Sequence, residues 1–561
     1  MFTARPTAVP DAAVDPVWTT RRPERTVLGV VHNVTSATRL FDVLPLLATD
    51  HRVEVIFACT GSSPFGRDVD PHLDRNRVHQ VGWSELAERR VDLTISTSHG
   101  GPLHELDSPV VILPHGMGYN KYLSAETRKS ENPVFGLAPE WLLSGGVPIA
   151  SSLVFSHDEQ VERLRDSCPA ALDVAVVAGD PCFDRMLASA PLRRTYRDAF
   201  GLQPGQQLVF VSSTWGPESL YGTAPKLVRE LRDELPLDEF AVAVALHPNI
   251  WAHHSPWQVE MWLDDCRRRG VVLVPPEEGW RAGLIASDLV VGDHGSVTFY
   301  GAALGKPTLL ATWPEDAVDP ASPVGMFIAA ADRLTPRRPL GEQVRAAIER
   351  GRTHQEITRF TTSVPGEAAR LLRAEFYRLL HLPEPEAPAL TRVVPLPELS
   401  PRPPAVEIVR ADLRIAEDQL SAALVRYTAD VAPLPAGAGL MVSTGEPCSA
   451  QLELADIVVH DQPGDAHGWI ADTLDAFPGA VLATMPVNGS TWVVGTRDAG
   501  FVEFTSAGGD GRVWSVVVLA WLREGRRVAD FPALVRLQAG QAGSASLCRV
   551  ASAEWSSPRS S

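Results

Sequence analysis

The chain has 561 residues, of which 45% are hydrophobic and 21% are charged, and its formal net charge is −17. This length exceeds what a single hydrophobic core organises, so we expect two or three globular domains. The negative charge argues against a protein that attracts nucleic acid or an anionic membrane through its whole surface, but it leaves room for a local basic patch.

The cysteines and the N-terminal segment indicate in which cellular compartment the protein is expected. The six cysteines are widely spaced and form no CxxC pair, which favours reduced thiols over a disulfide framework or a zinc site. Residues 1–25 lack an apolar stretch of signal-peptide length, and no later segment reaches the roughly 20 apolar residues of a membrane span. We therefore expect a disordered leader over 1–25 and a cytoplasmic protein, with peripheral membrane association as an alternative.

Regular structure is predicted from Thr26 onward, where apolar strands alternate with polar or helical stretches. Thr35 is the predicted N-cap of a first helix, which continues through ATRLFDVLPLLA. The alternation predicts an α/β fold with two tandem Rossmann-like, doubly wound domains at 26–190 and 191–380. The predicted strands of the first domain are RTVLGVVHNV, HRVEVIFACT and residues 91–97, 109–116, 152–157 and 174–180. Those of the second are residues 206–214, 240–249, 270–276, 287–293 and 306–312.

The character of the sequence changes after residue 380. Residues 381–407 are rich in proline, which predicts a semi-rigid linker rather than a helix or a central strand. Residues 408–550 are expected to form a small α+β domain of unknown role. Within it, the segment VRADLRIAEDQLSAALVRYTADV has the pattern of an amphipathic helix. Residues 486–522 are predicted to form β-hairpins, with turns at Asn488-Gly489 and Asp510-Gly511.

The stretch SDLVVGDHGSVTFYGAALGKPTLL, residues 287–310, combines a strand, a tight turn and a helix. Asp293 to Gly295 form the predicted turn. Ser296 is the predicted N-cap of a helix that begins at Val297 and is ended by Gly305. The first backbone N–H groups of such a helix lack internal partners and lie at the positive end of its dipole, so they suit a phosphate. Any strand–helix unit needs a capped helix, and this motif alone therefore decides little.

Polar residues follow other predicted strands as well. His115 follows PVVILP and His247 follows VAVAL, so each is expected at the carboxyl end of a parallel sheet, where ligands of such folds bind. Asp180 and Thr214 stand in the same position after two further strands. A single histidine of this kind is usually structural, but two of them together with a helix suited to phosphate favour a functional site.

Five motifs occur in the order LPHGMG, AGDPCFDR, VSSTWGPESLY, LHPN and SDLVVGDHGSVTFYGAALGKP. This series resembles the CDP-glycerol glycerophosphotransferases of teichoic-acid synthesis, and the resemblance covers residues 25–380. In that family HGT-type, GxPRxD-type, APTWR-type, HP and SDxxxTDYSS-type motifs succeed one another. The resemblance implies a GT-B fold, in which two Rossmann-like domains enclose the active site, the first (26–190) for the acceptor and the second (191–380) for the donor nucleotide. It also implies a relation to nucleotide-sugar glycosyltransferases and UDP-GlcNAc 2-epimerases.

The resemblance also implies roles for individual residues. His115 would be the general base that takes the proton of an acceptor hydroxyl. His247, the second catalytic candidate, would face the donor diphosphate. Asp180 and Asp184 would shape the hinge between the domains, and neither a cofactor nor a metal ion is implied. Donor phosphate oxygens would be held by residues at the helix start and at a neighbouring strand end: Asp293, Gly295, Ser296, Val297 and Thr214.

The sequence departs from the family pattern at several positions. His294-Gly295-Ser296 replaces Tyr-Ser-Ser, Cys182 stands where arginine is usual, and Gly216 stands where a basic residue is usual. We expect a metal-independent transferase that moves a glycerophosphate or a glycosyl group from a nucleotide-diphosphate donor. The acceptor would be a hydroxyl of a polyol, sugar or glycan, and no nucleic acid partner is expected. The alternatives are a UDP-GlcNAc 2-epimerase-like enzyme and a non-catalytic nucleotide- or sugar-binding protein.

Two further motifs carry weaker signals. The Asp-Val-Asp run at 68–70 matches the DxD signature of a different glycosyltransferase fold, but it stands in a polar loop away from any strand end. The pair His253-His254 has no carboxylate at a spacing that suits a metal ion. The surrounding tryptophans are interpreted as a packed flap, or equally as the lining of an acceptor site: Trp251, Trp257 and Trp262.

Overall fold

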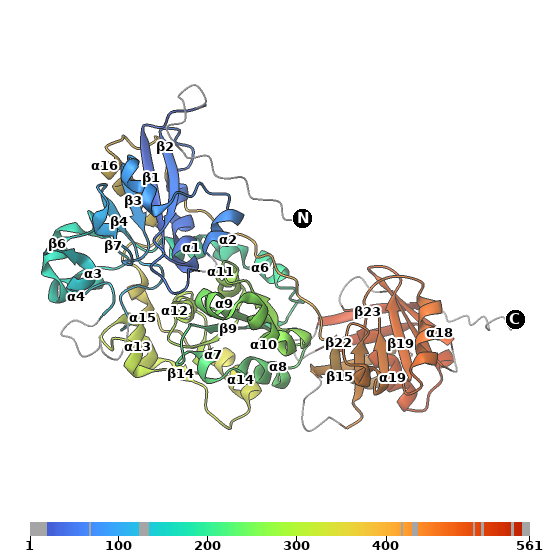
Figure 1. Cartoon of the computed structure of the whole chain (residues 1–561). Helices are drawn as coiled ribbons and strands as arrows, with labels where there is room; N and C mark the ends of the chain where they lie inside the picture. Colours follow the sequence, from blue (N-terminus) through green and yellow to red (C-terminus); the bar gives the residue numbers. More distant parts are fainter. Residues whose placement is uncertain are drawn as a thin grey trace. The chain divides into compact units, whose positions relative to one another are not determined.

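The computed structural model describes residues 20–66, 69–122, 134–416, 419–428, 436–497, 500–505, 510–539 and 544–551 (Figure 1). Contacts between Cα atoms divide the chain into two compact units. Of the described residues, the first unit contains 20–119, 134–184 and 362–391. The second unit contains residues 120–122, 185–361 and the described residues from 392 onward.

The first unit is built on a parallel sheet of six strands in the order β2-β1-β3-β4-β7-β8. Both faces of this sheet are buried, as expected when helices cross over between parallel strands. Val27 and Val31 pack with helices α1 and α16 on one face, whereas Leu28 and Val30 belong to the core on the other. The strands are β1 (Arg25–Val31), β2 (Val53–Cys59), β3 (Leu93–Ser96), β4 (Val110–Ile112), β7 (Ser152–Phe155) and β8 (Ala175–Val177). The other elements are α1 (Val34–Val43), α2 (Val69–Arg75), α3 (Pro139–Leu142), α4 (Asp158–Ser167), α5 (Pro181–Ser189), α16 (Ala368–Leu380) and the small hairpin of β5 (Leu143–Ser144) with β6 (Val147–Pro148).

Helix α1 begins at a different cap from the predicted one. Its N-cap is Asn33, whose side chain accepts a hydrogen bond from the Ser36 N–H, while the Ser36 hydroxyl accepts one from the Asn33 N–H, both at 2.9 Å. This reciprocal capping leaves Thr35 inside the first turn, so the prediction of a Thr35 cap is wrong. The helix ends at Val43, and a short 3-10 helix follows at Leu44–Leu47.

The second unit contains another parallel sheet of six strands, in the order β11-β10-β9-β12-β13-β14. Numbered along the chain, this order is 3-2-1-4-5-6, the order of dinucleotide-binding sheets, and it reverses between β9 and β12. The two parallel sheets confirm the predicted α/β class. The strands are β9 (Gln207–Ser213), β10 (Phe240–Leu246), β11 (Val272–Val274), β12 (Leu289–Gly292), β13 (Thr308–Leu310) and β14 (Asp332–Arg333). The helices are α6 (Arg193–Ala199), α7 (Leu220–Thr223), α8 (Leu227–Glu234), α9 (Pro248–His254), α10 (Pro256–Arg268), α11 (Trp280–Ala286), α12 (Ser296–Ala303), α13 (Pro323–Ala330), α14 (Leu340–Arg350) and α15 (Gln355–Thr358).

The C-terminal part of the second unit is a separate sheet that closes on itself, in the order β15-β16-β22-β23-β21-β20-β19-β18-β17 (Figure 1). Three consecutive strands, β17, β18 and β19, run parallel, and the others pair mainly antiparallel. The strands are β15 (Val406–Ala416), β16 (Gln419–Thr428), β17 (Gly439–Ser443), β18 (Ile457–Val459), β19 (Leu482–Pro486), β20 (Thr491–Thr496), β21 (Gly500–Thr505), β22 (Leu534–Ala539) and β23 (Ser544–Ala551). The helices are α17 (Ser449–Glu453), α18 (Ala466–Ala476) and α19 (Val513–Arg523).

Two local predictions in this domain are wrong. The predicted amphipathic helix at 409–431 forms most of the antiparallel pair β15 and β16. Leu420, Ala422 and Leu424 are buried at every second position of β16, and this period of two places one face against the core. The apolar run after Asp510-Gly511, predicted as a hairpin strand, is helix α19. That helix is buried on nearly all sides within the core of the closed sheet, and such a run cannot be told from a buried strand by periodicity alone. The predicted turn at Asn488-Gly489 does join two antiparallel strands, β19 and β20.

The proline-rich segment after residue 391 lies against the second unit. The Tyr196 hydroxyl donates to the Val394 carbonyl at 2.7 Å, and the Val394 N–H donates to the Ser189 hydroxyl at 2.8 Å. Arg185 Nε donates to the Arg392 carbonyl at 3.1 Å. Val394 itself is 2% exposed, so this segment is fixed to the surface instead of spanning solvent.

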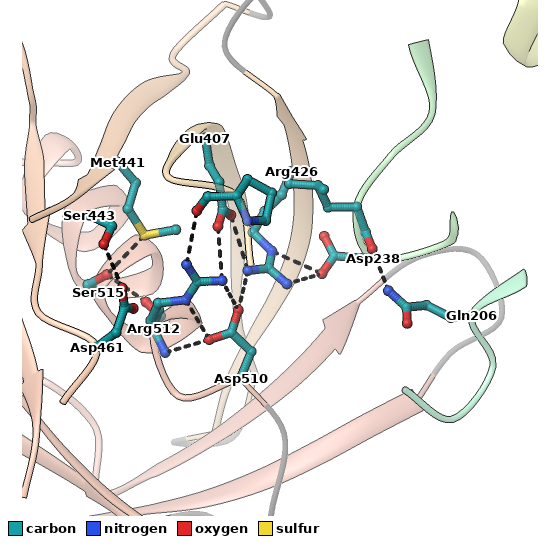
Figure 2. Close-up of polar contacts among 12 residues, drawn as sticks. Gln206, Asp238, Glu407, Arg426, Met441, Ser443, Asp461, Asp510, Arg512 and Ser515 are labelled. Atoms are coloured by element: carbon teal, nitrogen blue, oxygen red, sulfur yellow. Dashed lines mark hydrogen bonds and ion pairs between the residues drawn. The ribbon is translucent and has the colours of Figure 1, made fainter. Parts of the chain in front are cut away.

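A buried group of charges joins the closed sheet to the second parallel sheet (Figure 2). Arg426 on β16 bonds Asp238, which precedes β10, through Nε at 3.1 Å and Nη2 at 2.9 Å. Its Nη1 lies 3.2 Å from Glu407 Oε2 and 2.6 Å from Asp510 Oδ2. Arg512 bonds Asp510 at 2.8 and 2.9 Å and lies 3.0 Å from Glu407 Oε1. The C-terminal domain is therefore an anchored part of the second unit.

Within the described ranges, no helix has the length and apolar character needed to cross a membrane.

Candidate functional site

The polar residues that follow β9 and β12 meet where the strand order of the second sheet reverses. In open parallel sheets this position, beyond the carboxyl ends of the strands, is where ligands bind. Asp293 is 1% exposed, and its Oδ2 accepts hydrogen bonds from the backbone N–H groups of Thr214 and Leu220, each at 2.9 Å. Its Oδ1 accepts from the Gly295 N–H at 2.9 Å. Asp293 therefore holds both loops in place, and its direct contact with a phosphate stays a prediction.

The environment of Asp293 shifts its acidity. Burial raises the pKa of this carboxyl above its ordinary value, although the backbone N–H bonds and the nearby Lys121 ammonium act in the opposite direction. Lys121 lies close to the same loops, because its Nζ donates to Thr214 Oγ1 at 3.3 Å. Burial lowers the pKa of Lys121, and the charge of Asp293 partly restores it.

Helix α12 starts one residue earlier than predicted. Its N-cap is Gly295, in an extended conformation, and Ser296 is the first helical residue, so the prediction of a Ser296 cap is wrong. Because glycine has no side chain to accept a hydrogen bond, no side chain caps this helix. The first N–H groups, which include those of Ser296 and Val297, are thus left to an external acceptor.

The packing of the turn disfavours a side chain at position 295. A Cβ at this position would lie 3.0 Å from Asp293 Oδ1 and 3.1 Å from Thr214 Cβ, which is tighter than ordinary contact. The residues predicted as donor ligands are therefore brought together: Thr214, Asp293, Gly295, Ser296 and Val297.

Lys121 is a site residue that the sequence analysis missed. The segment that contains it belongs to the second unit, where Lys121 forms an antiparallel bridge with Val318 and the Asp319 N–H donates to the Asn120 carbonyl at 2.8 Å. In the sequence it stands almost a hundred positions before Thr214, and only its place shortly after the LPHGMG motif could have drawn attention to it.

His294 is held as a neutral ring beside this site. It is 6% exposed, and its Nδ1 has no hydrogen-bond partner among the described residues. Burial lowers its pKa to about 3, and the charge of Lys121 contributes to the same shift. The positive charge available here therefore comes from Lys121 and the helix N-terminus.

The hydrogen bonding of His247 leaves its Nε2 as the donor nitrogen of the ring. It is the N-cap of α9, and its Nδ1 accepts from the Asn249 N–H at 3.1 Å. In the neutral ring the proton is then on Nε2, which suits contact with an anion. The ring of Trp215, the residue after Thr214, lies 6.5 Å from the His247 ring, centroid to centroid.

His115, in the first unit, carries its proton on the other ring nitrogen. Its Nδ1 lies 3.0 Å from the Thr97 carbonyl oxygen, which can only accept, so Nδ1 carries the proton. Nε2 is then the basic nitrogen, as a general base requires. His115 is half-buried at the carboxyl edge of the first sheet. It follows β4, which is the neighbour of β3 in this sheet.

Two more histidines stand at the same edge and were not singled out from the sequence. His32 follows β1 and contacts Thr60 Oγ1 at 3.3 Å, and a Cβ on Gly100 would lie 2.4 Å from its ring. His99 follows β3, and burial lowers its pKa to about 4, with a smaller contribution from His115. The signal that could have found them is the one that found His115, a polar residue directly after a buried strand.

The remaining candidates have structural contacts or fall outside the described residues. Asp180 accepts from the Cys182 and Phe183 N–H groups, and Asp184 accepts from two N–H groups at the start of α16. Their role in a hinge stays a prediction. Of the DxD run, Asp68 lies outside the described residues. Among the residues that are described, no group of His, Cys, Asp or Glu is arranged to hold a metal ion.

The buried histidines predict a loss of stability in acid. An unfolded histidine has a pKa near 6.5, whereas folded His294 titrates at about 3, so below pH 6.5 the unfolded state binds a proton that the folded state does not. Each such histidine contributes a slope of at most about 1.4 kcal/mol per pH unit. Urea unfolding between pH 4.5 and 7.5 should show the free energy of unfolding falling as the pH falls.

Two variants test whether His294 causes this dependence of the free energy of unfolding on pH. His294→Gln should flatten it, and His104→Gln, which changes an exposed histidine of the first unit, should leave it unchanged. Equal slopes in His294→Gln and the unaltered chain would show that His294 is not the group responsible.

The fold and the site define an α/β protein with two Rossmann-like parallel sheets, a separate closed sheet and an anion-suited helix start at the reversal of strand order. No protein-family model and no curated protein matches the chain. Among solved structures, the wall teichoic acid polymerase TagF is 12% identical, with 64% of this chain and 90% of that one covered and a TM-score of 0.43.

Two further solved structures are similar to a comparable degree. A UDP-GlcNAc 2-epimerase from Neisseria meningitidis bound to UDP-GlcNAc is 13% identical, with 64% of this chain and 99% of that one covered and a TM-score of 0.39. A glycosyltransferase from Rickettsia africae is 12% identical, with 65% of this chain and 99% of that one covered and a TM-score of 0.35. Likenesses this distant do not establish an activity for this chain.

Proposed function

We propose that the chain is a GT-B-type transferase whose second unit binds a nucleotide-diphosphate-activated donor. The observation that carries this proposal is the uncapped start of α12 at the reversal of strand order, with the Lys121 ammonium beside it. A diphosphate needs several hydrogen-bond donors and positive charge at one place, and here backbone N–H groups and a lysine provide both. The boundaries expected from the sequence, 26–190 for the first Rossmann-like domain and 191–380 for the donor domain, stay a proposal, and α16 at the end of the second range packs in the core of the first unit.

In this proposal the two histidines have complementary tasks. His115 Nε2 takes the proton of the acceptor hydroxyl as its oxygen attacks the donor. The Nε2–H of His247 donates to the diphosphate and stabilises the charge that develops on the leaving group. Attack on the β-phosphorus transfers a glycerophosphate and releases CMP from a CDP-activated donor, whereas attack on an anomeric carbon transfers a sugar and releases a nucleoside diphosphate.

A thermal-shift panel of CDP, UDP, GDP, ADP and dTDP tests the donor site. A nucleotide present at about 100 times its dissociation constant should stabilise the folded chain by roughly 2.7 kcal/mol. Lys121→Met should weaken binding of that nucleotide about tenfold, because one charge-assisted contact is lost. Gly295→Ala should weaken it as well, since the new Cβ displaces Asp293 or Thr214.

Lys226→Met is the control, because Lys226 is exposed just before α8 and its side chain does not cap that helix. Equal shifts in the Lys121→Met and Lys226→Met variants, or no shift with any nucleotide, would contradict the proposed donor site. Turnover without any acceptor would favour the epimerase alternative instead.

A further inference from the structure

The exposed tryptophans of the described chain all lie in one part of the second unit. Trp215 is 45% exposed, Trp257 68% and Trp262 46%, and Met261 between them in the sequence is 55% exposed. An apolar surface of this kind on a protein is usually a binding surface, because large aromatic side chains are otherwise buried. Trp251, predicted to belong to the same flap, is instead 7% exposed and part of the core.

Ring contacts link some of these side chains, and helix α9 lies between Trp262 and the candidate donor site. Trp262 packs edge-on against His254 at 4.8 Å and lies 6.3 Å from Tyr221, centroid to centroid. His254 ends helix α9, and His247, which contacts Trp215, caps its start. Seven helical residues span about 10 Å, so the surface extends at least that far from Trp215. We call the following residues the aromatic surface: Trp215, Tyr221, His254, Trp257, Met261 and Trp262.

The segments that build the aromatic surface carry few charges, although the exposed Lys226 directly follows one of them and Arg229 of α8 pairs with Asp265 of α10. The segments that build it, residues 215–225 and 247–262, contain no lysine or arginine, and their acidic residues are Glu218 and Glu260. Surfaces that bind anionic lipids or phosphate polymers carry clusters of basic residues, because each contact neutralises a negative charge. An anionic partner is therefore disfavoured at this surface.

We propose that the aromatic surface binds the acceptor and that this acceptor is a neutral carbohydrate chain. A sugar ring presents apolar C–H groups on its faces, which pack on exposed aromatic rings, while its hydroxyls stay in water or bond polar ring atoms. Trp257 and Met261 are one helical turn apart on α10, so they present one continuous patch to such a ring. The inference rests on the proposed transferase function and specifies its acceptor class.

The position of Trp215 connects this surface to the chemistry. Its neighbour Thr214 is bonded to both Asp293 and Lys121, and its own ring contacts His247. An acceptor chain bound at Trp262 would extend along α9 toward Trp215 and the residues proposed to hold the donor phosphates. The same arrangement selects against a glycerol phosphate polymer, whose negative charges would meet Glu218 and Glu260.

Calorimetric titration of the full chain tests this inference. The neutral probes are the hexasaccharides of maltose, cellulose and chitin type, and the anionic probes are a glycerol phosphate oligomer and phosphatidylglycerol vesicles. We expect at least one neutral hexasaccharide to bind and neither anionic probe to do so. Trp257→Ala should weaken the binding about tenfold, as the loss of a stacked aromatic anchor does. Leu454→Ala, which removes a side chain 71% exposed in the C-terminal domain, should leave it unchanged.

Several results would overturn the inference. These are binding of no neutral hexasaccharide, binding that Trp257→Ala does not weaken, and binding of an anionic probe that requires Trp257. A dimer in sedimentation that Trp257→Ala dissolves would show that a second copy covers the surface. The nucleotide panel separates the two proposals: nucleotide binding without sugar binding refutes the acceptor surface alone, and sugar binding without nucleotide binding refutes the transferase.

Discussion

Replacing Arg426 with methionine is expected to lower the free energy of unfolding of the second unit by about 3–5 kcal/mol, because it leaves buried carboxylates without their partner. Arg426 contacts three carboxylates, Asp238, Glu407 and Asp510, whose side chains are 5%, 1% and 24% exposed (Figure 2). With Arg426 gone, the Arg512 guanidinium and the buried Arg232, which interacts electrostatically with Asp238 and Glu407, would remain to balance these charges.

The pKa shifts within the cluster also indicate that its carboxylates depend on the arginines. Burial raises the pKa of Glu407 above its ordinary value, although the guanidinium groups of Arg512 and Arg426 oppose the shift. At Asp510 burial also favours the protonated form, but the two arginines outweigh it and hold its pKa well below the usual range. Both carboxyl groups depend on Arg426 for the stability of their charged forms.

Arg410→Met is a matched control on the neighbouring strand β15. Arg410 pairs with Asp412 in an exposed ion pair, at 2.7 Å and with side chains 39% and 58% exposed, which is expected to contribute at most about 1 kcal/mol. The midpoints of urea unfolding of the two variants should therefore differ clearly. If Arg426→Met unfolds at the same urea concentration as Arg410→Met, the cluster does not stabilise the docked C-terminal domain. In a second comparison, adding Asp238→Asn to Arg426→Met should recover part of the loss, since it removes one unpaired charge.

Replacing His115 with alanine is expected to reduce turnover by about 10²–10⁴-fold, the usual contribution of a general base. The expectation follows from the hydrogen bond between Nδ1 and the Thr97 carbonyl, which leaves Nε2 as the basic nitrogen. Release of the nucleotide product is the measurement, with the donor that the thermal-shift panel identifies and with the neutral hexasaccharides as acceptors.

His115→Gln separates a base from a structural group. Glutamine can donate to the Thr97 carbonyl as histidine does, but it has no basic nitrogen, so we expect the same loss of turnover as in His115→Ala. Recovery of turnover in His115→Gln would mean that His115 only positions the loop. His104→Ala, at an exposed site in the first unit, controls for the loss of a histidine as such. Neither His115 variant should change nucleotide binding, because the proposed donor contacts belong to the second unit.

The candidate site could be predicted in part because its residues follow buried strands directly. Apolar runs such as VAVAL and LVVG are recognisable in one dimension, and the carboxyl ends of parallel strands meet at one edge, so Thr214, His247 and Asp293 could be placed without coordinates. The N-cap of α12 was misplaced by one residue because Gly295 and Ser296 are both acceptable caps. Packing against Thr214 and Asp293 decides between them.

Short-range hydrophobic patterns are enough to predict the α/β class, the positions of most strands and the group of residues at the strand ends. Other features depend on long-range packing. Lys121 reaches Thr214 through a long-range contact, 409–416 and 419–428 belong to the antiparallel strands β15 and β16, and 513–523 becomes a helix inside a closed sheet. In each case the conformation is set by the partners that bury the segment, and a local pattern compatible with both helix and strand does not contain that information.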